Sequence, residues 1–156
     1  MDSNLKELLS ALNAYSVRYV IIGGYAVFIH AQPRMTKDLD VFIESSPANA
    51  LTTFKALAAF GAPLQNFTVE DFCKPTQVAR FGNPPICFEL LQQISGLTFS
   101  EVYAHSKIVL VDGDLPVRYI SADDLITNKL ASGRPQDLAD VAAIRQAQAA
   151  TNKQKS

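Results

Sequence analysis

Several features that define specialised classes of protein are scarce or absent in this chain. It contains no tryptophan and only two cysteines, Cys73 and Cys87, and its formal net charge over 156 residues is −1. Two cysteines make a poor disulfide framework and here lack the spacing of metal ligands, so both are expected to be reduced, partly buried thiols. The near-zero charge gives no overall basic field that would attract nucleic acid, although a local basic groove remains compatible with it.

The sequence also lacks a long apolar run. The longest one, YVIIGGYAVFIHA at residues 19–31, contains two glycines and is shorter than the ~20 residues of a membrane-spanning helix. The N-terminal segment MDSNLKELL is charged and has helical spacing, so it does not resemble a signal peptide. We therefore expect a soluble cytoplasmic protein that does not associate with membranes.

What is present is the composition of an ordinary globular protein, with 48% hydrophobic and 19% charged residues. The length suggests a single domain over residues 1–150, followed by a polar, disordered tail at residues 151–156. The apolar pattern predicts an α+β fold in which a small mixed β-sheet is flanked by helices.

Individual elements follow from local patterns. Strands are predicted within 18–23, 39–44, 76–82 and 86–94, with Asn83-Pro84-Pro85 joining the last two, and a hairpin around Asp112-Gly113 within 107–120. Helices are predicted for the leucine-rich N-terminus with Asn4 and Glu7 as caps, for the segment after Gly24, and for 47–60, 98–106, 121–132 and the segment from Pro135, with a short helical turn at 68–73.

Two aspartates lie one residue apart in the second predicted strand. Asp38 and Asp40 point to the same face, while Leu39 and Val41 point to the core. Adjacent carboxylates repel each other unless a cation neutralises the pair. Mg²⁺ is a natural partner because it takes oxygen ligands and bridges to phosphates, and Mn²⁺ is equally compatible. The alternative is an edge strand that carries two solvated acids.

A glycine pair lies between the first predicted strand and the following helix. At Gly23-Gly24, backbone N–H groups and the N-terminus of the helix can hold phosphate oxygens. The pair belongs to neither a Walker loop nor a GxGxxG motif, and alone it is equally compatible with a tight turn. The combination of strand, Gly-Gly, helix and Asp-Leu-Asp is far more specific than either part.

Residues 21–43, IIGGYAVFIHAQPRMTKDLDVFI, resemble the signature of the DNA polymerase β-like nucleotidyltransferase superfamily. That signature is a hydrophobic residue, Gly-Gly or Gly-Ser, a spacer, and Asp-x-Asp/Glu on a strand. The chain is similar in particular to small bacterial nucleotidyltransferases related to AbiEii-type toxins, which also carry residues matching Arg34 and Thr36. Residues 123–141, DDLITNKLASGRPQDLADV, resemble a second signature of that family, with a lysine on one helix ahead of the start of the next.

The resemblance implies transfer of a nucleotidyl group from an NTP to an acceptor hydroxyl, with release of pyrophosphate. It assigns nucleotide binding to Gly23, Gly24, Arg34, Thr36 and Lys129. It further implies that Mg²⁺ or Mn²⁺ is held by three carboxylates, which together with Lys129 form the catalytic set: Asp38, Asp40 and Glu89.

The third carboxylate departs from the family pattern. Relatives commonly have Arg-Ile-Asp followed by apolar residues, whereas this chain has Cys87-Phe88-Glu89. The arginine is absent and the aspartate is replaced by the longer glutamate, which weakens the expectation of full activity. The alternative for Glu89 is a strand acid that faces solvent.

Other candidates also have structural alternatives. Lys129 would either reach a phosphate or lie on the surface of an amphipathic helix. Asp137 and Asp140 would cap the last helix, complement its dipole, or pair with Lys129 or Arg134. Arg34 would either neutralise the acids or bind phosphate.

Three hypotheses of different kinds follow. The first is an active nucleotidyltransferase whose acceptor is RNA, protein or a small molecule. The second is a binding module that has the nucleotidyltransferase fold without turnover and acts as an antitoxin or regulatory subunit. The third is an interaction protein in which the glycines and acids are incidental. Because the chain has little beyond the catalytic fold, a homodimer or a toxin–antitoxin partner is expected to complete substrate recognition.

Overall fold

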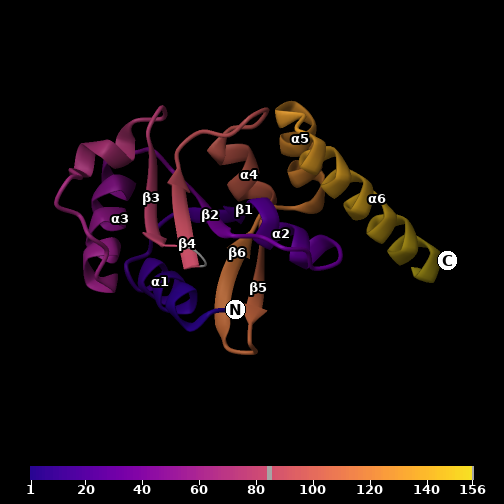
Figure 1. Cartoon of the computed structure of the whole chain (residues 1–156), viewed down its shortest axis with the longest axis horizontal. Coiled ribbons are helices and arrows are strands. Elements are labelled where there is room, and N and C mark those ends of the chain that lie inside the picture. Colours follow the sequence, from indigo (N-terminus) through magenta and orange to yellow (C-terminus); the bar gives the residue numbers. More distant parts are fainter. Residues whose placement is uncertain (84–85, 156) are drawn as a thin grey trace.

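The computed structural model describes residues 1–83 and 86–155 (Figure 1). Within these residues, strands form one mixed sheet in the order β3-β4-β2-β1-β6-β5. β1 pairs with β6, and β2 with β4, in parallel, and the other neighbours are antiparallel. The strands are β1 (Tyr19–Ile22), β2 (Asp38–Ile43), β3 (Val78–Asn83), β4 (Ile86–Leu91), β5 (Lys107–Val111) and β6 (Leu115–Tyr119).

Helices flank this sheet, which confirms the predicted α+β class. They are α1 (Ser3–Ala14), α2 (Gly23–His30), α3 (Pro47–Phe60), the 3₁₀ turn η1 (Val69–Cys73), α4 (Phe99–His105), α5 (Ala122–Ser132) and α6 (Pro135–Lys155). The predicted connection through Pro84-Pro85 lies outside the described residues. None of the helices in the described ranges is both long enough and apolar enough to span a bilayer.

The helix ends follow largely from local chemistry. Pro47 occupies the first turn of α3, and Gly61 ends it with φ 96°, as predicted. The predicted cap of α1 is wrong. Asp2, not Asn4, caps this helix, because its side chain accepts a hydrogen bond from the Asn4 backbone N–H at 2.8 Å.

The two faces of the sheet have different chemistry. On β2, Leu39 and Val41 are fully buried on the core face, as predicted, where helices α1 and α3 lie (Figure 1). The Phe60 ring of α3 packs on Phe88 of β4 with ring centroids 5.8 Å apart. The opposite face carries the acids of β2, and this alternation follows from the two-residue period of a strand.

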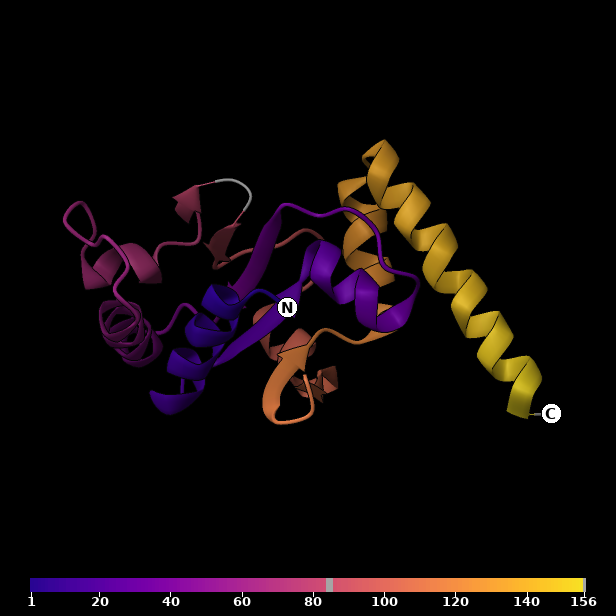
Figure 2. The ribbon, with the colours of Figure 1, turned by 60° about the horizontal axis from the view of Figure 1, so that its bottom comes forward.

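The C-terminal helix extends away from the body of the molecule (Figure 2). Residues 151–155, which their polarity predicts to be a disordered tail, are the last residues of α6. After Pro135 the helix contains neither proline nor glycine, and its alanines favour continuation of the helix. Local helix propensity therefore outweighs the polar composition of this end.

Candidate active site

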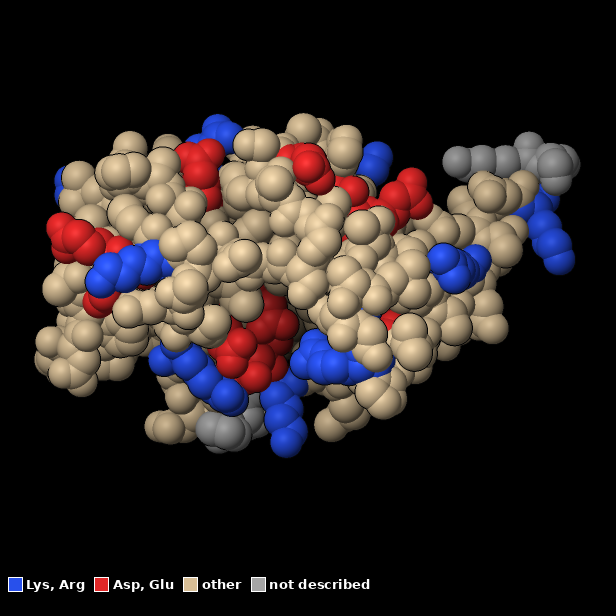
Figure 3. All heavy atoms as spheres, turned by 90° about the horizontal axis from the view of Figure 1, so that it is seen from above, with Lys and Arg blue, Asp and Glu red and all other residues tan. Residues whose placement is uncertain are grey.

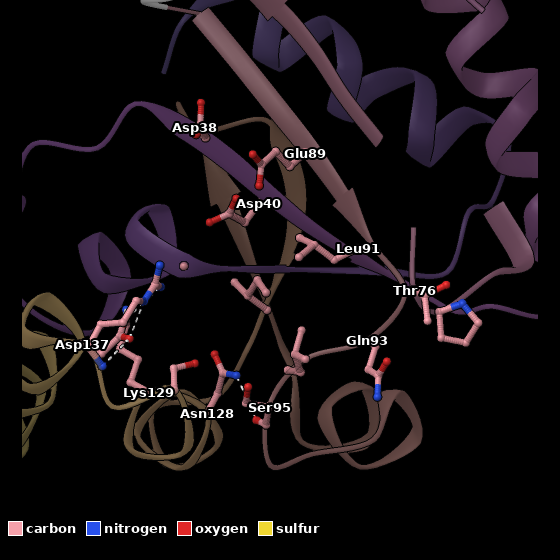
Figure 4. A pocket seen from close by; sticks show the side chains of 16 residues that line it. Asp38, Asp40, Thr76, Glu89, Leu91, Gln93, Ser95, Asn128, Lys129 and Asp137 are labelled. Carbon is pink, nitrogen blue, oxygen red and sulfur yellow. Dashed lines mark hydrogen bonds and ion pairs between the residues drawn. The ribbon is translucent and has the colours of Figure 1, made fainter. Parts of the chain in front are cut away.

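The strand register brings the three predicted carboxylates to one face of the sheet. β2 and β4 are parallel, with Asp38 opposite Cys87 and Asp40 opposite Glu89. Residues directly opposite each other point to the same face. Figure 4 shows the carboxylates of Asp38, Asp40 and Glu89 along one side of a cavity. Glu89 therefore does not stand apart from the other two acids, and its side chain is 23% exposed.

The environment of Asp40 disfavours its charge. Burial, followed by the negative charges of Glu89 and Asp38, raises the pKa of Asp40 to about 7. The positive charges of Lys129 and Arg134 act in the opposite direction. Further positive charge beside Asp40 would therefore favour its ionised form at neutral pH.

A guanidinium group from the edge strand already lies beside the acids. Arg80 of β3 is opposite Glu89 in the sheet, and its side chain is 3.4 Å from Asp38 Oδ1 and 3.5 Å from Glu89 Oε1. Its side chain is 55% exposed, so the energy of these pairs is modest. Arg80 thus places a guanidinium group beside these acids from the neighbouring strand, whereas position 87, where the resemblance has an arginine, is a cysteine.

The donor set suits a hard cation, although its present arrangement is open. Carboxylate oxygens are the ligands that Mg²⁺ and Mn²⁺ prefer, and Asp40 needs a positive charge. Among the described residues, no group of three Asp, Glu, His or Cys side chains is arranged so that it could hold a metal ion. Arg80 bridges two of the acids, so metal binding would require these side chains to converge.

The glycine pair is required by close packing around the acids. Gly23 has φ 69° and begins α2, and a Cβ atom there would overlap the Asp40 carboxylate. A Cβ atom on Gly24 would overlap the Thr36 hydroxyl and lie 2.7 Å from the Thr36 Cβ. The pair therefore lets the start of α2 approach Asp40 and Thr36, which a side chain at either position would prevent.

Lys129 is buried across the cavity from the acids (Figure 4). Its ammonium group lies 2.7 Å from Asp140 Oδ2 and 3.3 Å from Asp137 Oδ1, and its side chain is only 5% exposed. The alternative of a surface lysine is therefore wrong. Of the alternatives for the two aspartates, pairing with Lys129 holds for both, and Asp137 also accepts a hydrogen bond from the Arg134 backbone N–H at the start of α6.

Two arginines complete this cationic cluster. Arg34 donates from Nε and Nη2 to the two carboxylate oxygens of Asp140, at 2.8 and 2.9 Å. Arg134 donates from Nε to Asp137 Oδ2 at 2.8 Å, and its side chain is 77% exposed. Three cations thus surround two carboxylates, which leaves a net positive charge facing the acids of β2 and β4.

The pKa of each paired aspartate reflects these contacts. Burial acts to raise the pKa of Asp140, but hydrogen bonds from Lys129 and Arg34 outweigh it, so this pKa lies below its ordinary value. Burial likewise opposes the hydrogen bond from Arg134 and the charge of Lys129 at Asp137, and the pKa of Asp137 is also lowered. Both carboxylates are therefore ionised at neutral pH.

The acids and the cationic cluster border the same hollow in the surface. Figure 3 shows acidic atoms within a depression that has basic side chains beside it. The main cavity has a volume of about 800 Å³, and an adjoining one of about 390 Å³ contains Gly24, Arg34 and Thr36. Both cavities contain Gly23, Asp38, Asp40, Lys129, Arg134 and Asp137.

Some residues of the site are absent from the sequence-based set of candidates. Arg80, Thr76, Ser95 and Asn128 fall in this group, and Arg134 was considered there only as an ion-pair partner. One sequence signal could have identified Arg80. Arg80 and Glu89 flank a short predicted hairpin, and a known register of that hairpin would place them opposite each other.

We expect Gly24→Ala to lower the free energy of unfolding by about 1–3 kcal/mol, because the new methyl group overpacks against Thr36. Thr36→Gly removes the atoms that collide, so the double variant Gly24→Ala/Thr36→Gly should be more stable than the sum of the single effects predicts. Urea denaturation of all four proteins measures this coupling. Strictly additive effects would show that Gly24 is not constrained by Thr36.

The Asp140 contacts predict a specific pH dependence. The folded pKa lies below the ordinary 3.8, so the stabilisation by ionised Asp140 is complete above the unfolded pKa and is lost as the pH falls through the lowered folded value. At pH 7, Asp140→Asn should cost about 3–5 kcal/mol because it leaves buried cations unpaired. The difference from wild type should shrink between pH 5 and pH 3 in urea denaturation, and an unchanged difference would contradict the assignment.

Comparison with known proteins gives one family. Residues 1–148 match the family described as "Nucleotidyltransferase of unknown function (DUF6036)". A comparison with curated proteins gives no match. Since the matched range covers nearly the whole chain, this protein belongs to that nucleotidyltransferase family.

Proposed function

We propose that the chain is a metal-dependent nucleotidyltransferase that moves a nucleotidyl group from an NTP to an acceptor hydroxyl and releases pyrophosphate. One observation carries the proposal: Asp38, Asp40 and Glu89 lie side by side on the parallel strands β2 and β4 and face a cavity bordered by cations. In this arrangement the carboxylates would hold metal ions, and the cations on the other side of the cavity would contact phosphate oxygens.

The three carboxylates would hold Mg²⁺ or Mn²⁺. Such ions, when bound, neutralise charge on the phosphates and on the oxygens of the attacking and leaving groups. The need of Asp40 for positive charge and the hard oxygen donors support this assignment. The proposal requires Arg80 to move away from Asp38 and Glu89 when the metal binds.

The other site residues would position the triphosphate. Backbone N–H groups at Gly23-Gly24 and the N-terminus of α2 lie beside Asp40 and favour phosphate oxygens. Arg134 is the most exposed cation of the cluster and would contact phosphate directly. Lys129 and Arg34 would add positive charge while they stay bound to Asp140.

In the reaction, the acceptor oxygen forms a bond to the α-phosphorus of the NTP while the bond from that phosphorus to the oxygen bridging the α- and β-phosphates breaks. The electron pair of the broken bond leaves with pyrophosphate. The proton of the acceptor hydroxyl passes to a nearby carboxylate, for which Glu89 is the candidate.

The rival function is a binding module that retains the fold without turnover. It is favoured by the Cys87-Phe88-Glu89 segment, in which the family's arginine is absent and the acid is longer. Arg80 weakens this argument for a binding module, because it supplies a guanidinium group beside Glu89 from β3. The retained Asp38 and Asp40 also favour turnover.

The acceptor and the biological setting are part of the proposal. The likeness to AbiEii-type toxin nucleotidyltransferases suggests a toxin–antitoxin setting, with RNA, protein or a small molecule as the acceptor. The assay for the reaction therefore has to leave the acceptor open.

The decisive measurement is transfer of label from a mixture of α-³²P-labelled NTPs into cell extract with Mg²⁺ or Mn²⁺. Wild type should label one class of acceptor. Transfer should fall by about a hundredfold or more in Asp38→Asn/Asp40→Asn, because the charge that supports the transition state is lost. The matched control is Glu70→Gln/Asp123→Asn, which removes two exposed acids elsewhere and should retain transfer.

If wild type transfers no label but an NTP with Mg²⁺ raises its melting temperature, the binding module is the better assignment. Loss of that shift in Asp38→Asn/Asp40→Asn would place the bound nucleotide at the same acids. Equal labelling by wild type and the acid variant would contradict the proposed site.

The position of Arg80 predicts competition with metal. Arg80→Gln should raise the affinity for Mn²⁺ by a few-fold, since exposed charge pairs contribute up to about 1 kcal/mol. Isothermal titration with Mn²⁺ alone measures this, with Arg18→Gln, whose partner is Glu44, as a control that should leave the affinity unchanged. A lower affinity in Arg80→Gln would show that Arg80 instead holds the carboxylates in position for the metal.

A further inference from the structure

The sheet ends in a strand whose outer edge is open. β5 is the last strand in the sheet order, and within the described residues no strand pairs with its side away from β6. Figure 2 shows the β5–β6 hairpin projecting below the body of the molecule, at a distance from α6. An open edge presents unpaired backbone N–H and C=O groups to any strand that can pair with them.

The open edge also carries exposed apolar side chains. Ile108 and Leu110 are 58% and 60% exposed and, two residues apart, lie on the same face of β5. Only Met35 is more exposed among the large apolar residues of the described chain. Strand edges that remain free are usually protected by charges, proline or bulges, and residues 108–111 contain no charge and no proline.

The opposite edge of the sheet differs in this respect. β3 carries Arg80 and Gly82, and the guanidinium group of Arg80 is paired with Asp38 and Glu89. A charge and a glycine at an edge both oppose pairing with another strand. Residues 108–111 of β5 thus form an apolar edge segment without the charge and the glycine that β3 carries.

The β5 sequence is complementary to itself in one antiparallel register. If Val109 lies on a twofold axis, Ile108 of each copy lies opposite Leu110 of the other, so all four exposed side chains cover one another. In the same register Lys107 lies opposite the other copy's Val111, beside the turn that follows it. That turn contains two acids, Asp112 and Asp114.

Charge therefore agrees with the apolar register. Lys107 is the sole charged residue of β5. In this register Lys107 of each copy lies beside the acidic turn of the other copy. Asp112 is partly compensated within its own chain by Lys6 at 3.0 Å, whereas Asp114 has an exposed side chain. Opposite charges near the ends of a strand pair favour this register over shifted ones.

We propose that two copies of this chain pair through their β5 strands, antiparallel about Val109, and join their sheets into one continuous sheet. The partner is a second copy because the apolar pairs and the charge pattern match when the sequence is paired with itself. Two strands, β1 and β6, separate β5 from β2, which carries Asp38 and Asp40. The inference does not depend on the proposed function.

The first test is the mass of the full chain in solution, measured by light scattering during gel filtration. Wild type is expected to be a dimer. Leu110→Lys should halve the mass, because two ammonium groups would replace the apolar contacts with Ile108 on either side of the axis. Leu51→Lys is the matched control, since Leu51 is an exposed apolar residue of α3 and its replacement should leave the dimer intact.

The second test addresses the register by disulfide trapping in a Cys73→Ser background. Val109→Cys should yield a covalent dimer on mild oxidation, because the two sulfurs face each other across the axis. Lys107→Cys, although more exposed, should yield little, because its two copies lie about 13 Å apart in this register.

Three results would overturn the inference. They are a monomeric wild type at the highest soluble concentration, a dimer that persists in Leu110→Lys, and equal trapping at positions 107 and 109. A monomeric wild type would indicate that the partner of the β5 edge is a strand from a different protein. Circular dichroism of each variant separates loss of the dimer from loss of the fold.

Discussion

The register between β2 and β4 is the constraint on which the site depends. With Asp40 opposite Glu89, the acids of both strands face the cavity while Leu39 and Phe88 face the core. A slip of one residue would turn an acid into the core, where an unpaired carboxylate is costly to bury. The hydrophobic core on the far face therefore fixes the chemistry on the near face.

The cationic cluster around Lys129 and the acidic cluster on β2 and β4 differ in how fully their charges are compensated. Lys129 is buried and its ammonium group is paired with two aspartates. The acids on β2 and β4 are only partly compensated by the exposed Arg80, so they retain a demand for positive charge. A cationic cluster facing an under-compensated acidic one suits a ligand that brings both phosphates and metal ions.

Local patterns predicted the fold class, most of the helices and strands, and the common face of Asp38 and Asp40, whereas Glu89 was assigned from the family resemblance. They did so because strand alternation, helix capping and glycine are short-range signals. The sequence does not reveal the role of Arg80, because its position depends on the pairing of β3 with β4. It does not reveal the burial of Lys129 either, because the two aspartates that pair with Lys129 lie on the following helix. The extent of α6 was underestimated because polar composition was given more weight than helix propensity.

The change from Arg-Ile-Asp to Cys87-Phe88-Glu89 has a consistent physical interpretation. Cys87 is 1% exposed, so a guanidinium group at this position would start from a buried site. Placing the guanidinium group on Arg80 of the edge strand leaves it 55% exposed, where it remains solvated and free to move. A glutamate has one more rotatable bond than an aspartate, so its carboxylate can contact such an arginine or turn toward Asp40. Arg80 thus supplies a guanidinium group to both Glu89 and Asp38, so this face of the sheet combines three carboxylates with an exposed arginine although Cys87 itself carries no cation.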